Sequence, residues 1–288
     1  MSAATPLIIV IIGVGGIGSA IAQRIGSGRL LLLADSSQAN LDEASTHLEL
    51  RGHRTKTQAV DISNASSLEK LANFASSLGH IHTVIHAAGV SPVASSAAQI
   101  YTIDLVGTAN VIDAFQPVMT PGSSLLCVAS MAGHLVDLPP AEQSHLSTAP
   151  TSRLVECPSI DANSDDSSKA YSISKLANIL RVRASARSYG EKGARINSIS
   201  PGIISTALGR EELAGETGAF IRRTIETCPA RRIGTVDDVA EAAAFMTGPN
   251  ASFMTGTDLL IDGGASGIMK EAIEQRRRAA AAEPEAAA

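Results

Sequence analysis

Seven short apolar runs recur along this chain, and each is separated from the next by a stretch long enough to form a helix. The runs are Leu7–Ile12, Leu30–Ala34, Thr55–Val60, Ile81–His86, Ser124–Ala129, Arg195–Ile199 and Asp258–Ile261. The helical stretches are Ile17–Arg24, Gln38–Glu49, Ser67–Ser77, Ala98–Phe115, Tyr171–Tyr189 and Asp237–Met246. Such alternation is typical of strand–helix–strand units with parallel strands. We therefore predict an α/β fold: a Rossmann-type, doubly wound parallel sheet of about seven strands with helices on both faces.

The size and composition of the chain agree with one domain of this kind. It has 288 residues, of which 44% are apolar and only 3% are aromatic, so small and branched aliphatic side chains must fill the core. That composition suits buried parallel strands covered by helices. We expect residues 1–268 to form a single domain and residues 269–288 to form a flexible C-terminal tail.

Residues 134–168 interrupt the alternation, because they are rich in Pro, Ser and Asp and contain no strand-like run. A structureless loop of this length is uncommon inside a compact domain. We therefore expect short helical pieces, one of which opens at Pro139-Pro140, since proline is favoured at the start of a helix.

Charge and cysteine content exclude several classes of function. A net charge of −5 and a pI near 5.8 leave no basic surface for nucleic acid. The three cysteines, Cys127, Cys157 and Cys228, are widely spaced and form neither a disulfide framework nor a metal-binding pair. The seven histidines also lack ligand spacing, so we expect no metal and a reducing, cytoplasmic compartment.

The run Leu7–Ile12 has the look of a signal-peptide core, but no Lys or Arg precedes it and four glycines follow within six residues. A buried strand explains these facts better. Because no window approaches the roughly 18 apolar residues that span a bilayer, we expect no membrane partner.

A glycine pattern of the form G-x-G-x-x-G, made by Gly13, Gly15 and Gly18, directly follows the first run and precedes a helical stretch. The pattern alone is weak in a chain with 24 glycines, but this context is typical of a dinucleotide-binding turn. Gly13 would permit the tight turn, Gly15 the approach of a pyrophosphate, and Gly18 close packing of helix on strand. With Gly16 and Ile17, the helix start would offer N–H groups to the phosphates. The alternative is an ordinary glycine-rich turn.

Asp35 ends the second run, where a carboxylate can accept hydrogen bonds from ribose hydroxyls and repel a 2′-phosphate. Two serines follow it, where a phosphate-binding arginine would be wanted. This favours NAD as the cofactor and leaves NADP possible; alternatively, Asp35 only caps the next helix. Asp61 and Ile62 follow the third run and are expected near the adenine, with a plain N-cap as the alternative for Asp61.

Tyr171 and Lys175 are four residues apart in a helical stretch and therefore lie on one face. A neighbouring ammonium favours the phenolate form of a tyrosine and lowers its pKa from about 10. Such a tyrosine can give or take an alcohol proton as a general acid or base. A solvated face that carries the same pair by chance is the alternative.

The glycine turn, Tyr171-x-x-x-Lys175, the segment 197–202 (NSISPG) and the segment 256–264 (GTDLLIDGG) together resemble the short-chain dehydrogenase/reductase family. The resemblance covers about residues 6–265. It implies that Tyr171 is the acid/base, that Lys175 holds the nicotinamide ribose, and that Ser130 hydrogen-bonds the substrate oxygen. It also assigns cofactor contacts, after the fourth and sixth strands, to Ala87, Ala88, Gly89, Pro201, Gly202, Ile204 and Thr206.

Three departures from the family pattern stand out. The glycine turn lacks the usual Thr-Gly opening, although the segment 86–89, which begins with His86, matches the family's Asn-Asn-Ala-Gly. Asp104 stands where the family has an asparagine whose backbone carbonyl serves a proton relay to the lysine, so we count Asp104 among the catalytic residues. Ser130 and Tyr171 are 41 positions apart, where about a dozen is common, which identifies 134–168 as an insertion near the active site. It would form either a substrate wall or a surface excursion that alters subunit packing.

These features predict an NAD(P)-dependent oxidoreductase that interconverts a small-molecule secondary alcohol and a ketone, with Tyr171 as general acid/base. The resemblance implies a homodimer or homotetramer. A non-redox isomerase, dehydratase or cyclase on the same scaffold and a cofactor-sensing binding protein are the alternatives. The sequence names no substrate.

Overall fold

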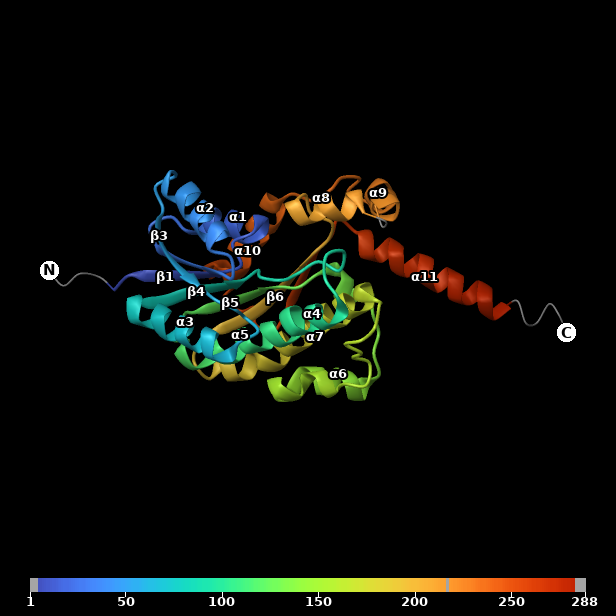
Figure 1. The fold of residues 1–288 in the computed structure, drawn as a ribbon, viewed down its shortest axis with the longest axis horizontal. Coiled ribbons are helices and arrows are strands. Elements are labelled where there is room, and N and C mark those ends of the chain that lie inside the picture. Colours follow the sequence, from blue (N-terminus) through green and yellow to red (C-terminus); the bar gives the residue numbers. More distant parts are fainter. Residues whose placement is uncertain (1–4, 216–217, 283–288) are drawn as a thin grey trace.

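Seven parallel strands form the centre of the molecule in the computed structural model, which describes residues 5–215 and 218–282 (Figure 1). The strands are β1 (Leu7–Ile12), β2 (Leu30–Asp35), β3 (Arg54–Ala59), β4 (His80–His86), β5 (Ser124–Val128), β6 (Arg195–Pro201) and β7 (Asp258–Ile261). Their order across the sheet is β3-β2-β1-β4-β5-β6-β7. The predicted doubly wound sheet is confirmed, and every apolar run of the sequence supplies one strand.

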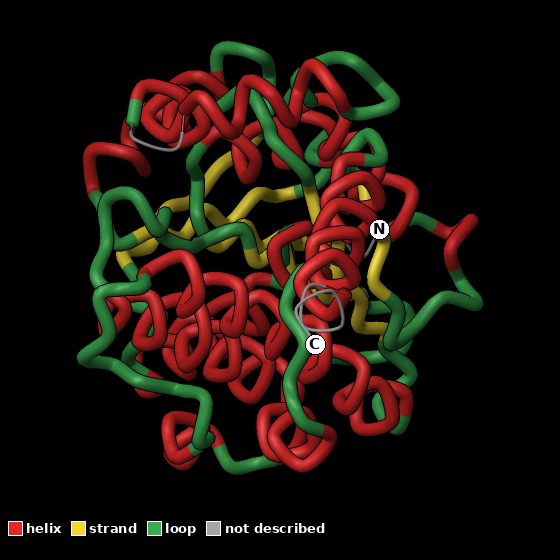
Figure 2. The backbone as a smooth tube through the Cα atoms, turned by 90° about the vertical axis from the view of Figure 1, so that its right-hand side faces the viewer, coloured by secondary structure: helices red, strands yellow, loops and turns green. Residues whose placement is uncertain are grey.

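Helices cover both faces of this sheet, as the side view shows (Figure 2). One layer contains α1 (Gly16–Ile25), α2 (Gln38–Glu49) and α10 (Val236–Thr247), and the other contains α3 (Ala65–Leu78), α5 (Thr108–Phe115) and α7 (Ser167–Gly190). Alternate residues of β1 enter different cores: Ile8 packs with the α3 layer and Ile9 with the α1 layer. Burial on both faces explains why this strand is uninterruptedly apolar.

The predicted helix Ala98–Phe115 is not uniform. It consists of α4 (Ala97–Ile100), a π-helical segment at Tyr101–Gly107, and α5. Within the π-helical segment Asp104 is fully buried, and its carbonyl oxygen accepts a bond of 2.8 Å from the Thr108 hydroxyl. A widened turn of this kind is often found at functional sites, and it has no signature in apolar spacing.

Residues 134–168 contain the expected short helical pieces. A 3-10 turn at Met131–His134 precedes α6 (Pro140–Thr148), and a second one follows at Thr151–Glu156. Leu146 and Leu154 are fully buried in a cluster with Ile173 of α7, and α6 lies outside α7 in Figure 1. Most of this segment therefore covers the outer face of α7.

Three helices complete the C-terminal part: α8 (Ala207–Ala214), α9 (Gly218–Thr227) and α11 (Ala265–Ala282). Short 3-10 turns occur at Gln116–Val118 and Pro249–Ala251. Figure 1 shows α11 extending away from the sheet and its helices. Residues 269–282, expected as a tail, continue this helix, and residues 283–288 lie outside the described part. Among the described helices none is long and apolar enough to cross a membrane.

Candidate active site

The glycine turn lies where the strand order reverses, between β1 and β4. Gly13 has φ +90°, and a Cβ there would lie 2.3 Å from the backbone nitrogen of Ala88, so the turns after the two strands touch. A Cβ on Gly18 would lie 1.9 Å from the Gly13 carbonyl oxygen, so α1 begins in close contact with the turn after its strand. A Cβ on Gly15 would have no atom of the described residues within 4 Å. A ligand can therefore approach the backbone at this glycine, beside the start of α1.

Two cavities meet at the switch point, at the carboxyl edge of the sheet. The first, of about 320 Å³, lies over β1, β2 and β4. Its lining includes the predicted cofactor residues Gly13, Gly15, Asp35, Asp61, Ile62, Ala87, Ala88 and Gly89. Ligands of open α/β sheets bind at this position, and a nucleoside with its phosphates suits the donors and acceptors there.

Asp35 is fixed by two backbone groups. Its Oδ2 accepts from Val14 N–H at 3.0 Å and its Oδ1 from Ser37 N–H at 2.9 Å. The N-cap of α2 is Ser37, so Asp35 is not the cap. Asp61 accepts from Ser63, and Asn64 caps α3, so a plain N-cap is also wrong for Asp61. Both carboxylates instead line the first cavity.

The second cavity, of about 740 Å³, lies on the other side of the switch point. Ser130, Tyr171 and Lys175 line it together, at the ends of β5 and on α7. The predicted cofactor residues Ile17, Ala87, Gly89, Pro201, Gly202, Ile204 and Thr206 also line it. Gly16, Gly18 and Asp104 line neither cavity: Gly18 packs against the glycine turn, Gly16 is exposed at the start of α1, and Asp104 lies behind Lys175.

The turn that carries Ser130 is pressed against α7. The Ser130 hydroxyl oxygen accepts from the N–H of Ala132 at 3.2 Å. Ser130 thereby caps the 3-10 turn that follows β5. A Cβ on Gly133 would lie 2.7 Å from the backbone of Lys175 and Leu176. Gly133 thus permits the close approach that brings Ser130 to the same cavity as Tyr171, a contact that no sequence pattern indicated.

Lys175 is almost fully buried, with its Nζ 5.2 Å from the centroid of the Tyr171 ring and 3.6 Å from Asp104 Oδ2. Burial by itself lowers the pKa of Lys175, but the combined attraction of Asp104, Tyr171 and their neighbours raises it above the ordinary value. Burial raises the pKa of Asp104, and Lys175 and the Val90 N–H oppose this. The site therefore presents a charged ammonium beside a phenol.

His86 extends the polar network behind the cavity. The Thr108 hydroxyl gives its proton to the Asp104 carbonyl, so the Nε2–H of His86 donates to Thr108 at 2.9 Å. His86 Nδ1 is buried and has no hydrogen-bond partner among the described residues. Burial, with repulsion from Lys175, lowers the pKa of His86 to about 3, so the ring is neutral.

The open end of the second cavity is formed in part by the end of the segment 134–168, for which a substrate wall was one of the two predictions. Its lining there includes Val93, the segment 165–168, Phe220 and Ile221. Phe220 of α9 is 57% exposed although it is a large apolar side chain. The open end therefore presents apolar side chains and, at the start of α7, two carboxylates and two serines.

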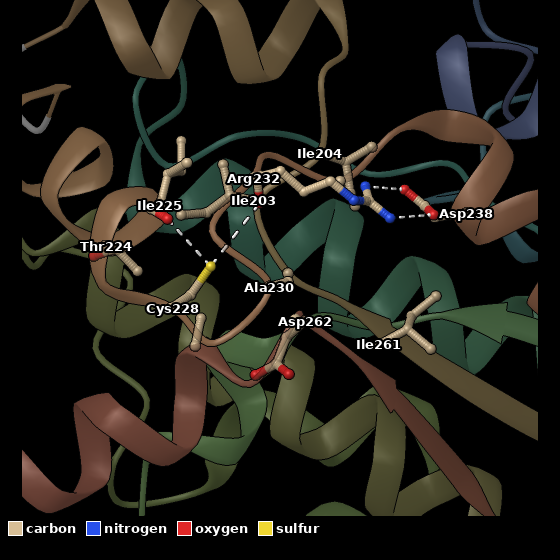
Figure 3. Close-up of a pocket in the computed structure, with 14 residues that line it drawn as sticks. Ile203, Ile204, Thr224, Ile225, Cys228, Ala230, Arg232, Asp238, Ile261 and Asp262 are labelled. Carbon is tan, nitrogen blue, oxygen red and sulfur yellow. Dashed lines mark hydrogen bonds and ion pairs between the residues drawn. The ribbon is translucent and has the colours of Figure 1, made fainter.

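A third cavity, of about 250 Å³, lies behind the loop 201–206 and is drawn in Figure 3. Its polar groups are paired within the protein. Arg232 forms two bonds of 2.7 and 2.8 Å with Asp238, and the Cys228 thiol lies 3.3 Å from the Ile225 carbonyl oxygen. This cavity lies behind the loop, whereas Ser130, Tyr171 and Lys175 line the second cavity. The described residues contain no group of His, Cys, Asp or Glu that could hold a metal ion.

Comparison with known proteins decides the family. Residues 7–140 match the family model described as short chain dehydrogenase, and residues 140–266 match the one described as enoyl-(acyl carrier protein) reductase. A short-chain dehydrogenase/reductase, bsc3, of Alternaria brassicicola is 38% identical over 259 residues, which are 89% of this chain and 94% of the relative. This chain belongs to the short-chain dehydrogenase/reductase family. It is therefore an oxidoreductase of a family that uses NAD or NADP.

Proteins of lower sequence identity align over similar lengths. The 2-(S)-hydroxypropyl-CoM dehydrogenase 3 of Xanthobacter autotrophicus is 27% identical over 89% of this chain and 94% of its own. A solved short-chain dehydrogenase/reductase from Brucella melitensis is 26% identical with a TM-score of 0.70, over 90% of this chain and 96% of that one. Levodione reductase, at 23% identity and a TM-score of 0.72 over 91% and 98%, shares the fold.

Proposed function

We propose that this short-chain dehydrogenase/reductase interconverts a secondary alcohol and a ketone, with Tyr171 as general acid/base. The observation that carries the proposal is the common wall of Ser130, Tyr171 and Lys175 in the second cavity, with the ammonium 5.2 Å from the phenol ring. A charged group in this position favours loss of the phenolic proton.

A bound nicotinamide dinucleotide would supply or accept the hydride at the substrate carbon. In ketone reduction the Tyr171 hydroxyl gives its proton to the substrate oxygen, and in alcohol oxidation the phenolate takes it back. The Ser130 hydroxyl donates to the same oxygen while negative charge develops on it. Lys175 keeps its charge beside Tyr171 and is the residue that would hold the nicotinamide ribose.

The cofactor we propose is NAD, and NADP is the second candidate. The residues fit a dinucleotide because Gly15 leaves its backbone open beside the start of α1. Asp35 lines the first cavity with its carboxylate already oriented by Val14 and Ser37. A fixed negative charge there favours a free ribose hydroxyl over a 2′-phosphate.

The substitution Tyr171→Phe tests this function, and α7 offers a matched control. Tyr171→Phe should reduce kcat by at least about a hundredfold, because the proton donor is lost, while NADH binding stays near that of the wild type. Tyr189→Phe makes the same change on the same helix, where the hydroxyl donates to the Ile112 carbonyl at 2.9 Å. It should lower stability by about 1 kcal/mol and leave turnover intact. Retained turnover in Tyr171→Phe contradicts the proposal.

A panel of ketones and secondary alcohols, assayed with NAD(H) and NADP(H), separates the remaining alternatives. A redox reaction changes the absorbance of NADH in step with product. An isomerase, dehydratase or cyclase would form product without that change, and a sensing protein would bind the dinucleotide without turnover.

A further inference from the structure

Asp104 and Lys175 form a buried pair of opposite charges behind the second cavity. Their side chains are 0% and 6% exposed, and Asp104 Oδ2 lies 3.6 Å from Lys175 Nζ. Oδ1 accepts from the Val90 N–H at 2.9 Å, which fixes the carboxylate against the loop after β4. Oδ2 has no hydrogen-bond partner in the described protein. The second oxygen is thus left facing the ammonium.

The backbone is shaped to allow this contact. The π-helical segment Tyr101–Gly107 carries Asp104 into the interior. A Cβ on Gly89 would lie 3.0 Å from Asp104 Oδ1 and 3.3 Å from Lys175 Nζ. Any larger residue at this position would therefore press on both members of the pair.

The other titratable groups around Lys175 do not supply a compensating charge. Burial lowers the pKa of His86 to about 3 and raises the pKa of Cys127 to about 12, so both are neutral near pH 7. Tyr171 is the group whose protonation the reaction changes. Asp104 is the carboxylate in this cluster, and the asparagine that the family has at this position would carry no charge.

We propose that Asp104 is a positioning residue, whose carboxylate is the direct counter-ion of Lys175 and holds the ammonium beside Tyr171. The pair is net neutral, so Tyr171 faces a compensated cation instead of an isolated one. For catalysis, this inference rests on the proposed role of Tyr171. Asp104 therefore tunes the pH at which the tyrosine exchanges its proton.

The pair itself is tested in the cofactor-free protein by a double-mutant cycle of Asp104→Asn and Lys175→Met. Each single change leaves one buried charge without its partner, whereas the double variant removes both charges. We expect the loss of unfolding free energy in the double variant to be clearly smaller than the sum of the single losses. Asp104→Asn combined with Arg24→Met, whose partner is the exposed Glu241, should be additive. Additive losses in the first cycle would overturn the proposal.

The effect on proton exchange is tested by the pH dependence of alcohol oxidation. In Asp104→Asn the pH of half-maximal kcat should fall by about half a unit or more, because the uncompensated ammonium favours the phenolate. Asp104→Glu restores the charge and should return the midpoint to that of the wild type, even if kcat is lower. An unchanged or higher midpoint in Asp104→Asn refutes the role. Because the cycle needs neither substrate nor cofactor, its failure is distinct from a failure of the proposed function.

Discussion

Asp35 combines a structural and a proposed recognition role in one carboxylate. Each oxygen accepts a backbone N–H, one from the glycine turn at Val14 and one from Ser37 at the start of α2. The carboxylate therefore ties the glycine turn to the end of β2 while it lines the first cavity. Only an acceptor on both oxygens satisfies this arrangement, because both partners are donors.

Asp35→Asn should change the choice of cofactor. The amide cannot accept from both N–H groups, so we expect a loss of about 1–2 kcal/mol of stability. Removal of the negative charge should also raise kcat/KM with NADP relative to NAD by about tenfold. Asp42→Asn removes the same charge from the exposed surface of α2 and should leave the ratio unaltered. If the ratio of kcat/KM with NADP to that with NAD were unaltered in Asp35→Asn, the ribose would not lie at this residue.

At the residue scale, spacing along the sequence predicted the proximity of side chains on one helix but not contacts between distant segments. Tyr171 and Lys175 are four apart on one helix, so their proximity follows from helical periodicity. The contact of Lys175 with Asp104 joins residues 71 positions apart and depends on a π-helical segment and on Gly89. Local spacing carries no signal for such a contact.

At the scale of elements, the glycine turn contains two kinds of glycine. Gly13 and Gly18 are required by the protein itself, because a Cβ on either would meet backbone atoms at 2.3 and 1.9 Å. A Cβ on Gly15 would meet no atom in the described part of the chain, and its φ of −64° suits any residue. A need for glycine at position 15 would therefore come from a ligand.

Gly15→Ala consequently reports on the phosphates alone. The variant should lose at most about 1 kcal/mol of stability, since alanine is a poorer N-cap than glycine. Its dissociation constant for the dinucleotide, measured by calorimetric titration, should rise at least about tenfold because the methyl group occupies the approach to the backbone. Gly18→Ala should instead lower stability by about 2 kcal/mol or more, through the clash with Gly13. If Gly15→Ala bound the dinucleotide with wild-type affinity, the pyrophosphate would not lie at this turn.

The segment 134–168 contacts both the outer face of α7 and the second cavity. Its middle part packs on α7 through Leu146 and Leu154, and Arg181 of α7 donates to the Ala149 carbonyl at 2.9 Å. Its last residues, 165–168, line the second cavity. One segment thus covers a helix and lines the cavity. Composition alone could not show which part of the segment does which. That it is an insertion relative to the family stays a prediction.

At the scale of the whole molecule, parallel topology explains most of what the sequence could predict. Because all seven strands point the same way, the turns after β1, β2, β4, β5 and β6 gather at one edge, and the predicted residues gather with them. The expected homodimer or homotetramer and the cytoplasmic location stay predictions. An oligomer has to form on a surface other than the face of α7 that α6 and the turn Thr151–Glu156 already cover.

The stability of the whole fold should depend on pH through His86. Its pKa is about 3 in the folded protein, against 6.5 as the ordinary value, because burial and then Lys175 disfavour the charged ring. Between these values the unfolded chain binds a proton that the folded protein excludes, so stability is lost as the pH falls below about 6.5. From pH 6.5 to pH 5 this amounts to about 1.5 kcal/mol.

His86→Asn, which restores the family residue, isolates this contribution. His82, whose pKa burial also lowers, is present in both proteins and cancels in the comparison. Urea unfolding at several pH values should give a shallower fall of stability on acidification for the variant, whatever its stability at pH 7. The asparagine amide can still donate to Thr108. A difference in the slope of unfolding free energy against pH therefore comes from the loss of the titratable imidazole. Parallel curves would mean that His86 binds its proton equally well in the folded protein, which a buried ring beside the Lys175 ammonium should not do.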